Sequence, residues 1–224
     1  MTRSFSGPAL SPDGTRVIYR RLERGGPAGL WMSAVAGGQP VRLVNGAETD
    51  YTGSWSPDGK WYVYRHLQDG RESLNKVKTT GGAEPEVLKA DVKRSGNWVP
   101  LWSPANDWIL YGDDGVKLIA PDGKTTRDVS RTSALAYAFS ADGHTIYGLR
   151  QPVALGPVEL FSMSVTGGSE KTMGSLAHDH VPSASVAPSL RLSLTPDGKS
   201  LTYSIVRTTS NLWLMDGLKS VTVR

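Results

Sequence analysis

Residues 55–64 read Trp-Ser-Pro-Asp-Gly-Lys-Trp-Tyr-Val-Tyr, a tight turn followed by a short apolar run. Proline presets φ at the second turn position, and aspartate and glycine accept the backbone conformations that follow. The run after the turn is too short for a helix and is rich in aromatic and β-branched residues, so it predicts a strand. Residues 53–55 predict another strand before the turn, and the whole stretch therefore indicates a β-hairpin.

The same turn phrase recurs along the chain. Its five copies begin at Ser11, Ser56, Ser103, Ser140 and Thr195. Neighbouring copies are separated by about 37 to 55 residues, a spread that brackets the ~40–45 residues of one four-stranded propeller blade. The third copy is the weakest match, because residues 103–106 read Ser-Pro-Ala-Asn instead of Ser-Pro-Asp-Gly.

Two further strand patterns follow each hairpin. An apolar segment recurs at 30–32, 73–77, 116–119, 159–163 and 211–215. A glycine hairpin turn such as Gly81-Gly82 ends it, and a more polar segment such as 86–88 comes next, as expected for a strand at the rim of a blade. The repeat predicts an all-β fold, a β-propeller of about five four-stranded blades. A two-sheet sandwich is the alternative, but it does not require a repeat of this length.

We expect a single propeller domain over residues 1–224. Its blades are predicted at approximately 5–48, 49–93, 94–131, 132–176 and 177–224. Radial packing would bury the faces of each sheet against its neighbours, which isolated four-stranded sheets cannot do. If the ring is incomplete, exposed blade edges are expected to pair between chains and give a homodimer.

Composition excludes several classes of function. The 224 residues include no cysteine, which excludes disulfides, thiolate metal sites and a cysteine nucleophile. The net charge is only +4, and no compact basic run is interleaved with aromatics, so we expect no nucleic-acid partner. No window approaches 18 apolar residues, so we expect no membrane insertion. The first residues carry no apolar signal segment as they stand, which leaves the compartment unknown and a longer parent protein open.

The sequence resembles a known family. Residues 55–64, followed by a strand beginning at Leu74 and by Thr80-Gly81-Gly82, resemble the propeller repeat of TolB-like proteins. The same repeat occurs in the propellers of prolyl-oligopeptidase-type and tricorn-like proteases. Residues 194–215 resemble the closing repeat of such domains in bacterial sensor, kinase and regulator proteins. The resemblance implies a bacterial propeller that binds peptides or partner proteins or gates a catalytic domain, often in the periplasm or otherwise outside the cytoplasm.

Propeller geometry sorts the loops onto two faces. The Ser-Pro-Asp-Gly turns and the glycine hairpins share one face, and the loops between second and third strands share the other with the connections between blades. Ligands usually bind at such loops near the central channel. We therefore expect the ligand-binding face to include Arg20, Arg65, His66, Asp113, Arg150 and Arg207. Basic groups outnumber acids there, which favours a protein, peptide or small anionic ligand; the alternative is an ordinary polar loop surface.

The longest gap between repeats contains a pair of histidines. His178 and His180 would point the same way in an extended segment and could share zinc or another divalent metal. His66, Asp113 or Asp114 could complete the site from neighbouring blades. Such a metal could activate water to hydrolyse phosphate or carboxylic esters. A His-x-His pair is a weak signal, so ordinary loop histidines and no cofactor remain the main interpretation.

Other catalytic signatures are missing from the sequence. It contains no Gly-x-Ser-x-Gly nucleophile elbow, no Walker-type phosphate loop and no dinucleotide fingerprint. The sequence therefore predicts a non-catalytic binding and interaction module. The alternative is a metal-dependent hydrolase that uses His178 and His180.

Overall fold

The computed structural model describes residues 5–22, 28–44, 49–93, 99–131, 134–153, 156–176, 192–195, 197 and 199–203. Within these residues the regular secondary structure consists of eighteen strands. The expected all-β propeller is confirmed. The number of blades stays a prediction, because the last predicted strands lie outside the described residues. No helix in the described part is long and apolar enough to cross a membrane.

The strands form antiparallel sheets in chain order. Blade 1 consists of β1 (Phe5–Leu10), β2 (Arg16–Leu22), β3 (Ala28–Ala34) and β4 (Val41–Arg42). Blade 2 consists of β5 (Thr49–Trp55), β6 (Trp61–Gln68), β7 (Arg71–Lys78) and β8 (Glu86–Val92). Blade 3 consists of β9 (Leu101–Trp102), β10 (Ile109–Gly112), β11 (Val116–Ile119) and β12 (Thr126–Ser130). Blade 4 consists of β13 (Ala136–Phe139), β14 (Thr145–Arg150), β15 (Glu159–Ser164) and β16 (Lys171–Ser175), and a hairpin follows with β17 (Leu192–Leu194) and β18 (Leu201–Tyr203).

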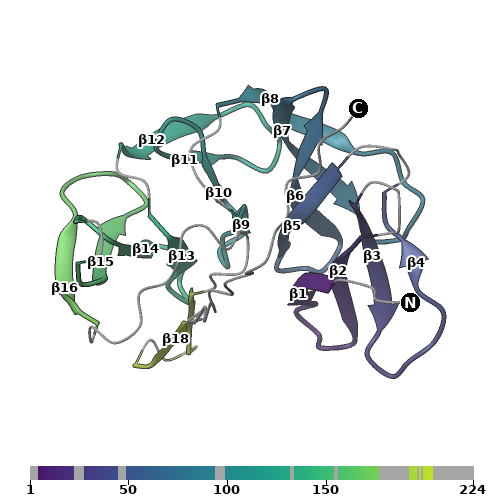
Figure 1. Ribbon diagram of the computed structural model, residues 1–224, viewed down its shortest axis with the longest axis horizontal. Helices are drawn as coiled ribbons and strands as arrows, with labels where there is room; N and C mark the ends of the chain where they lie inside the picture. Colours follow the sequence, from purple (N-terminus) through teal and green to yellow (C-terminus); the bar gives the residue numbers. More distant parts are fainter. Residues whose placement is uncertain are drawn as a thin grey trace, which may run out of the picture.

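The sheets succeed one another around a common centre (Figure 1). The first strand of each blade is innermost, and the fourth strand lies at the rim. Apolar side chains fill the space between consecutive sheets. Ile18 of blade 1, for example, packs with Tyr62 and Tyr64 of blade 2, and all three are fully buried. The core is therefore divided into clusters between blades, which is why no blade can be stable alone.

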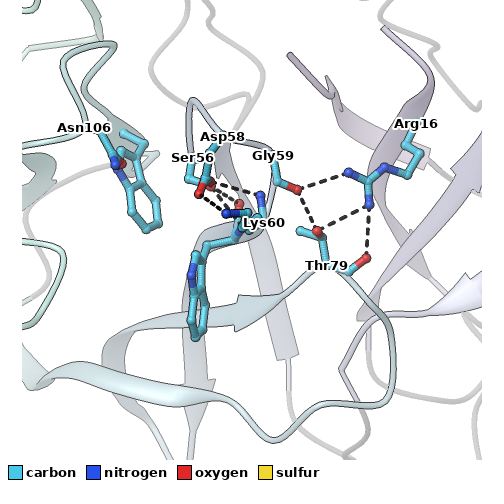
Figure 2. A network of polar contacts seen from close by, with 9 residues as sticks. Arg16, Ser56, Asp58, Gly59, Lys60, Thr79 and Asn106 are labelled. Carbon is cyan, nitrogen blue, oxygen red and sulfur yellow. Dashed lines mark hydrogen bonds and ion pairs between the residues drawn. The ribbon is translucent and has the colours of Figure 1, made fainter. Parts of the chain in front are cut away.

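Each Ser-Pro-Asp-Gly turn is fixed by the same hydrogen bonds. In blade 2, the Ser56 hydroxyl donates to Asp58 Oδ1 at 2.6 Å, and the Lys60 amide donates to the same oxygen at 3.1 Å. The Trp61 amide donates to Ser56 Oγ at 2.9 Å and closes the turn (Figure 2). The bonds that Asp58 Oδ1 accepts lower the pKa of Asp58, chiefly the one from the Ser56 hydroxyl and next the one from the Lys60 amide.

The third turn forms although its sequence departs from the pattern. Asn106 stands where the other turns have glycine and adopts the left-handed conformation with φ 61°. Its backbone N–H donates to the Ser103 carbonyl at 2.9 Å. The side chain of Asn106 also accepts a 2.8 Å hydrogen bond from Nε1 of Trp102. Asp107 replaces the missing turn aspartate by accepting from Ser103 Oγ at 2.9 Å.

Cations join consecutive blades on the turn side of the molecule. Arg16 of blade 1 donates to the carbonyls of Gly59 and Thr79 in blade 2, at 3.1 and 3.2 Å (Figure 2). Lys76 of blade 2 donates to the Pro121 carbonyl at 2.8 Å, and Arg127 of blade 3 donates to the Val165 carbonyl at 3.0 Å. Each of the first three blade boundaries thus has one cation that binds a backbone carbonyl of the next blade.

Candidate ligand-binding face

The most distinctive group on the loop side surrounds Tyr51. This half-buried residue lies on β5, the inner strand of blade 2, at the end opposite the turn. Cζ of Arg20, from blade 1, lies 5.1 Å from the centre of the tyrosine ring. Cζ of Arg65, from β6, lies 4.1 Å from the same centre. The aromatic ring therefore contacts guanidinium groups from two neighbouring blades.

Arg65 is buried inside the blade. Its exposed fraction is 3%, and that of Glu72 on the adjacent strand β7 is 5%. Nε of Arg65 lies 3.7 Å from Oε2 of Glu72, so the two charges form a buried ion pair. A buried charge needs such a partner, because desolvation is costly. The structure thus places Arg65 in a buried ion pair and against the Tyr51 ring, and the ligand-binding role predicted for it stays a prediction.

His66 projects from the other side of strand β6. Adjacent residues of a strand point to opposite faces, so His66 does not converge with Arg65. Its ring meets the buried ring of Tyr64 edge-on, with the centroids 6.4 Å apart. His66 therefore lies on the same side of blade 2 as Tyr64, the side that faces blade 1.

Asp113 fixes the connection between blades 2 and 3. It follows β10, is 8% exposed, and accepts a 2.9 Å hydrogen bond from the Lys93 amide just after β8. Oδ2 of Asp113 also lies 3.6 Å from Nζ of Lys117. Burial, together with the charges of Asp113 and Asp128, raises the pKa of Tyr111 to about 12. Tyr111 is therefore a neutral core residue at physiological pH.

Arg150 is held within blade 4. Nε of Arg150 binds Glu159 at 3.1 Å, Nη2 binds Thr172 at 2.9 Å, and Nη1 contacts Glu170. Its Cζ also lies 4.9 Å from the centre of the Phe161 ring. These contacts cross from β14 to β15 and β16, so Arg150 ties the strands of its own blade together.

Three of the predicted site residues lie outside the described residues, namely Arg207, His178 and His180. The ligand-binding role of Arg207 and the metal site of the two histidines therefore stay predictions. Within the described ranges, no group of three or more His, Asp or Glu side chains could hold a metal ion. His66, Asp113 and Asp114 do not form such a group on their own.

The structure adds two residues that the sequence argument missed, Tyr51 and Glu72. Their importance depends on which strands become neighbours, and no local motif marks it.

The arrangement of Arg20, Tyr51 and Arg65 suits recognition of an anionic group. A guanidinium that stacks on an aromatic ring uses its flat face, so its N–H donors lie in the plane where a carboxylate binds. Arg65, which is paired with Glu72, also lies against the Tyr51 ring, and this contact limits reorganisation of the ring on binding.

Comparison with known proteins finds similarity to bacterial proteins at low sequence identity. No family model matches it. It is 26% identical over 214 residues, 90% of this chain, to the "Uncharacterized peptidase YuxL" of Bacillus subtilis (strain 168). It is also 26% identical over 132 residues, 58% of this chain, to a TolB homologue of Chlorobium luteolum. The chain spans 29% and 30% of the length of these two relatives.

Solved structures agree on the fold. A putative TolB from Agrobacterium tumefaciens superimposes with a TM-score of 0.67 at 21% identity, covering 88% of this chain and 73% of that one. An oligogalacturonate lyase in complex with manganese superimposes with a TM-score of 0.61 at 17% identity, covering 86% and 56%. At these identities the likeness establishes the propeller fold.

Proposed function

We propose that this chain, which has the fold of the TolB-like β-propellers, is a binding module that takes a carboxylate-bearing segment of a peptide or protein on its loop face. The observation that carries the proposal is the contact of Arg20 and Tyr51 across the boundary of blades 1 and 2, with the ring centre 5.1 Å from the guanidinium carbon. Aromatic and arginine side chains are the residues that most often dominate binding to a protein partner.

Two further observations support the loop face over the turn face. The polar side chains of the turn face are engaged in the fold, since Ser56 and Asp58 close their own turn and Arg16 binds backbone carbonyls of the next blade. On the loop face, a half-buried tyrosine is supported by an ion pair that is almost fully buried. Inner-strand residues near the loops are where propellers and other scaffolds carry their binding residues.

The test is a peptide panel measured by fluorescence anisotropy. Labelled pentapeptides of one sequence would carry either a free C-terminal carboxylate or a C-terminal amide. We expect the carboxylate form to bind more tightly, and its affinity to fall as salt is added. Arg20→Gln and Tyr51→Ala should each weaken binding at least about tenfold, which corresponds to ~1.4 kcal/mol.

Lys60→Gln is the matched control, because it removes one positive charge from an exposed residue of the turn face. It should leave binding unchanged. Equal affinity for the carboxylate and amide peptides, binding that survives Arg20→Gln, or no binding across the panel would contradict the proposal.

The hydrolase alternative depends on His178 and His180, which lie outside the described residues, and it stays a prediction. The manganese of the lyase belongs to that protein. A location outside the cytoplasm and the lack of a nucleic-acid partner also stay predictions of the sequence.

A further inference from the structure

The dipeptide Asp-Gly recurs along the sequence, and its backbone can react with its own side chain. The glycine nitrogen attacks the carboxyl carbon of the aspartate, and the new C–N bond closes a five-membered imide. The C–O bond breaks, and the oxygen leaves as water with the amide proton and the carboxyl proton. Glycine favours the attack because it has no Cβ to obstruct the approach.

Water then reopens the imide at either of its two carbonyl groups. Attack at the side-chain carbonyl restores aspartate. Attack at the main-chain carbonyl gives isoaspartate, in which the backbone passes through the former side chain and is one methylene longer. The water lost in the first step is regained in the second, so the conversion needs no other reactant.

In four Asp-Gly pairs on the turn face, the fold holds both reacting groups in hydrogen bonds. The glycine amide donates to the carbonyl three residues earlier at 2.8–2.9 Å, and the aspartate Oδ1 accepts from the amide two residues later at 2.9–3.1 Å. These pairs begin at Asp13, Asp58, Asp122 and Asp142. The nitrogen cannot reach the carboxyl carbon unless such bonds break, so the turns are protected.

The charge of the turn aspartates protects them further. Hydrogen bonds, chiefly from the Ser11 hydroxyl, lower the pKa of Asp13 to about 2. The pKa values of Asp58 and Asp142 are lowered in the same way, chiefly by Ser56 and Ser140. The neutral carboxyl group loses its oxygen readily as water, whereas the carboxylate does not. A lowered pKa therefore keeps these side chains in the unreactive form.

Asp69-Gly70 lies in a different setting on the loop face. The two residues form the turn between β6 and β7, where Gln68 pairs with Arg71, and their φ angles are 50° and 76°. Both are exposed. Among the contacts of the described residues, none is a hydrogen bond to the Asp69 carboxylate or from the Gly70 amide. Nothing lies within 4 Å of the Cβ position of Gly70, so the turn has room to rearrange.

The second Asp-Gly pair of the loop face is more restrained. The Cβ position of Gly115 lies 2.5 Å from the Ser130 carbonyl oxygen, so this glycine is packed against the backbone of the next strand. The carboxylate of Asp114 lies 3.8 Å from Nζ of Lys93. Asp69-Gly70 is therefore the pair, within the described ranges, whose nitrogen and carboxyl group are both unrestrained.

We propose that Asp69-Gly70 is a modification site, at which Asp69 converts spontaneously through the imide to isoaspartate. The product adds one backbone atom to a two-residue turn, and the length of such a turn fixes the register of its strands. Strands β6 and β7 carry Arg65 and Glu72, whose ion pair lies against Tyr51 through Arg65. Isoaspartate at 69 should therefore weaken ligand binding, an effect that rests on the proposed function.

The modification is tested without any ligand. The intact chain is kept at neutral pH in water enriched in oxygen-18, which enters the peptide each time an imide reopens. Trypsin then releases residues 66–71, in which Asp69 is the only acidic residue. Mass spectrometry with electron-transfer fragmentation identifies isoaspartate. We expect label and isoaspartate to appear at Asp69 at least about tenfold faster than at Asp13, Asp58, Asp122 or Asp142, since those four must first break hydrogen bonds.

Two controls separate the fold from the dipeptide itself. In urea all the Asp-Gly pairs should react at similar rates, because the hydrogen bonds of the turns are lost. Asp69→Glu should abolish labelling of residues 66–71, because glutamate would have to form a less favourable six-membered ring. Equal rates at all pairs in the folded chain, or an advantage of Asp69 that persists in urea, would overturn the proposal.

The effect on binding is tested by comparing fresh and aged protein with the C-terminal carboxylate peptide. The fraction of binding-competent protein should fall as isoaspartate accumulates at 69, and the aged Asp69→Glu variant should keep its binding. Full binding by the isomerised protein would overturn the link to the ligand site. If fresh protein bound no peptide, the proposed function would fail, whereas the mass spectra would still decide the modification.

Discussion

Gly53 shows how strictly one residue can be specified in a blade. It lies on β5 at the irregularity between Tyr51 and Ser54, and its amide donates to the Tyr62 hydroxyl at 2.8 Å. A Cβ atom at this position would be 1.7 Å from the Val63 carbonyl oxygen. A backbone carbonyl cannot move away as the end of a side chain could, so the strands would have to separate.

We therefore expect Gly53→Ala to destabilise the protein by about 3 kcal/mol or more, as overpacking in a core does. Urea unfolding followed by tryptophan fluorescence would measure it. Gly174→Ala on β16 is the control, because nothing lies within 4 Å of its Cβ position. That variant should change stability by less than about 0.5 kcal/mol. Similar losses in both variants would show that the close approach at Gly53 is not the cause.

The turn aspartates predict a specific dependence of stability on pH. Hydrogen bonds from the Ser11 hydroxyl and from Thr15 lower the pKa of Asp13 from 3.8 to about 2. A lowered pKa in the folded state means that the carboxylate stabilises the fold above pH ~4, and that this contribution is lost as the pH falls from about 4 to about 2. Asp58, Asp142 and Asp197 have pKa values shifted in the same direction, each chiefly by a Ser or Thr hydroxyl.

We expect Asp13→Asn to be less stable than the native sequence at pH 7, because the uncharged amide is a weaker acceptor. The two proteins should become nearly equal at pH 2, where the native carboxyl is also substantially protonated. Urea midpoints at the two pH values test this. A stability difference that does not narrow in acid would contradict the role given to the ionised carboxylate.

At the scale of the elements, the folded chain has contacts between blades that no single repeat contains. In these contacts a cation of one blade binds a backbone carbonyl of the next. Arg16 donates to two carbonyls and to Oγ1 of Thr79, and its Cζ lies 4.9 Å from the centre of the Trp55 ring. We expect Arg16→Gln to cost about 1.5–3 kcal/mol, the range for hydrogen bonds that involve a charged group. Chemical denaturation with Lys60→Gln as the control would measure it. If the free energy of unfolding fell by less than about 0.5 kcal/mol in both variants, the Arg16 contacts between blades would not contribute measurably to stability.

The elements also separate what the sequence could predict from what it could not. Strands and turns follow from local signals, such as Ser56-Pro57-Asp58-Gly59 and the apolar run after it. The third turn was harder to predict, because Asn106 replaces the glycine and the carboxylate of Asp107 lies two residues further along than the usual turn aspartate. The group at Tyr51 could not be predicted, since Arg20 contacts the ring from another blade and Arg65 is paired with Glu72 of a neighbouring strand. Arg150 was placed on the ligand-binding face because it is basic and close to a loop. Its contacts with Glu159 on β15 and with Glu170, just before β16, depend on strand pairing that no local motif shows, and its role in ligand binding stays a prediction.

At the scale of the whole molecule, the core consists of separate clusters between neighbouring blades. Leu74 of blade 2 is fully buried in the cluster that it shares with Trp102 and Ile109 of blade 3. Blades 1 and 4 contribute to other clusters. Such a chain should respond to damage as a set of units coupled to their nearest neighbours.

Leu74→Ala should therefore destabilise the protein by about 2–5 kcal/mol, the usual cost of truncating a buried leucine. Its effect on amide hydrogen exchange should be local: protection should fall most in β6, β7, β9 and β10, and least in β14 and β15, which lie beyond blade 3. Val87→Ala is the control, because that side chain is 61% exposed. Protection that fell by the same factor in every blade would mean that the ring opens only as a whole. The interfaces between blades would then be strong enough to make the propeller a single cooperative unit.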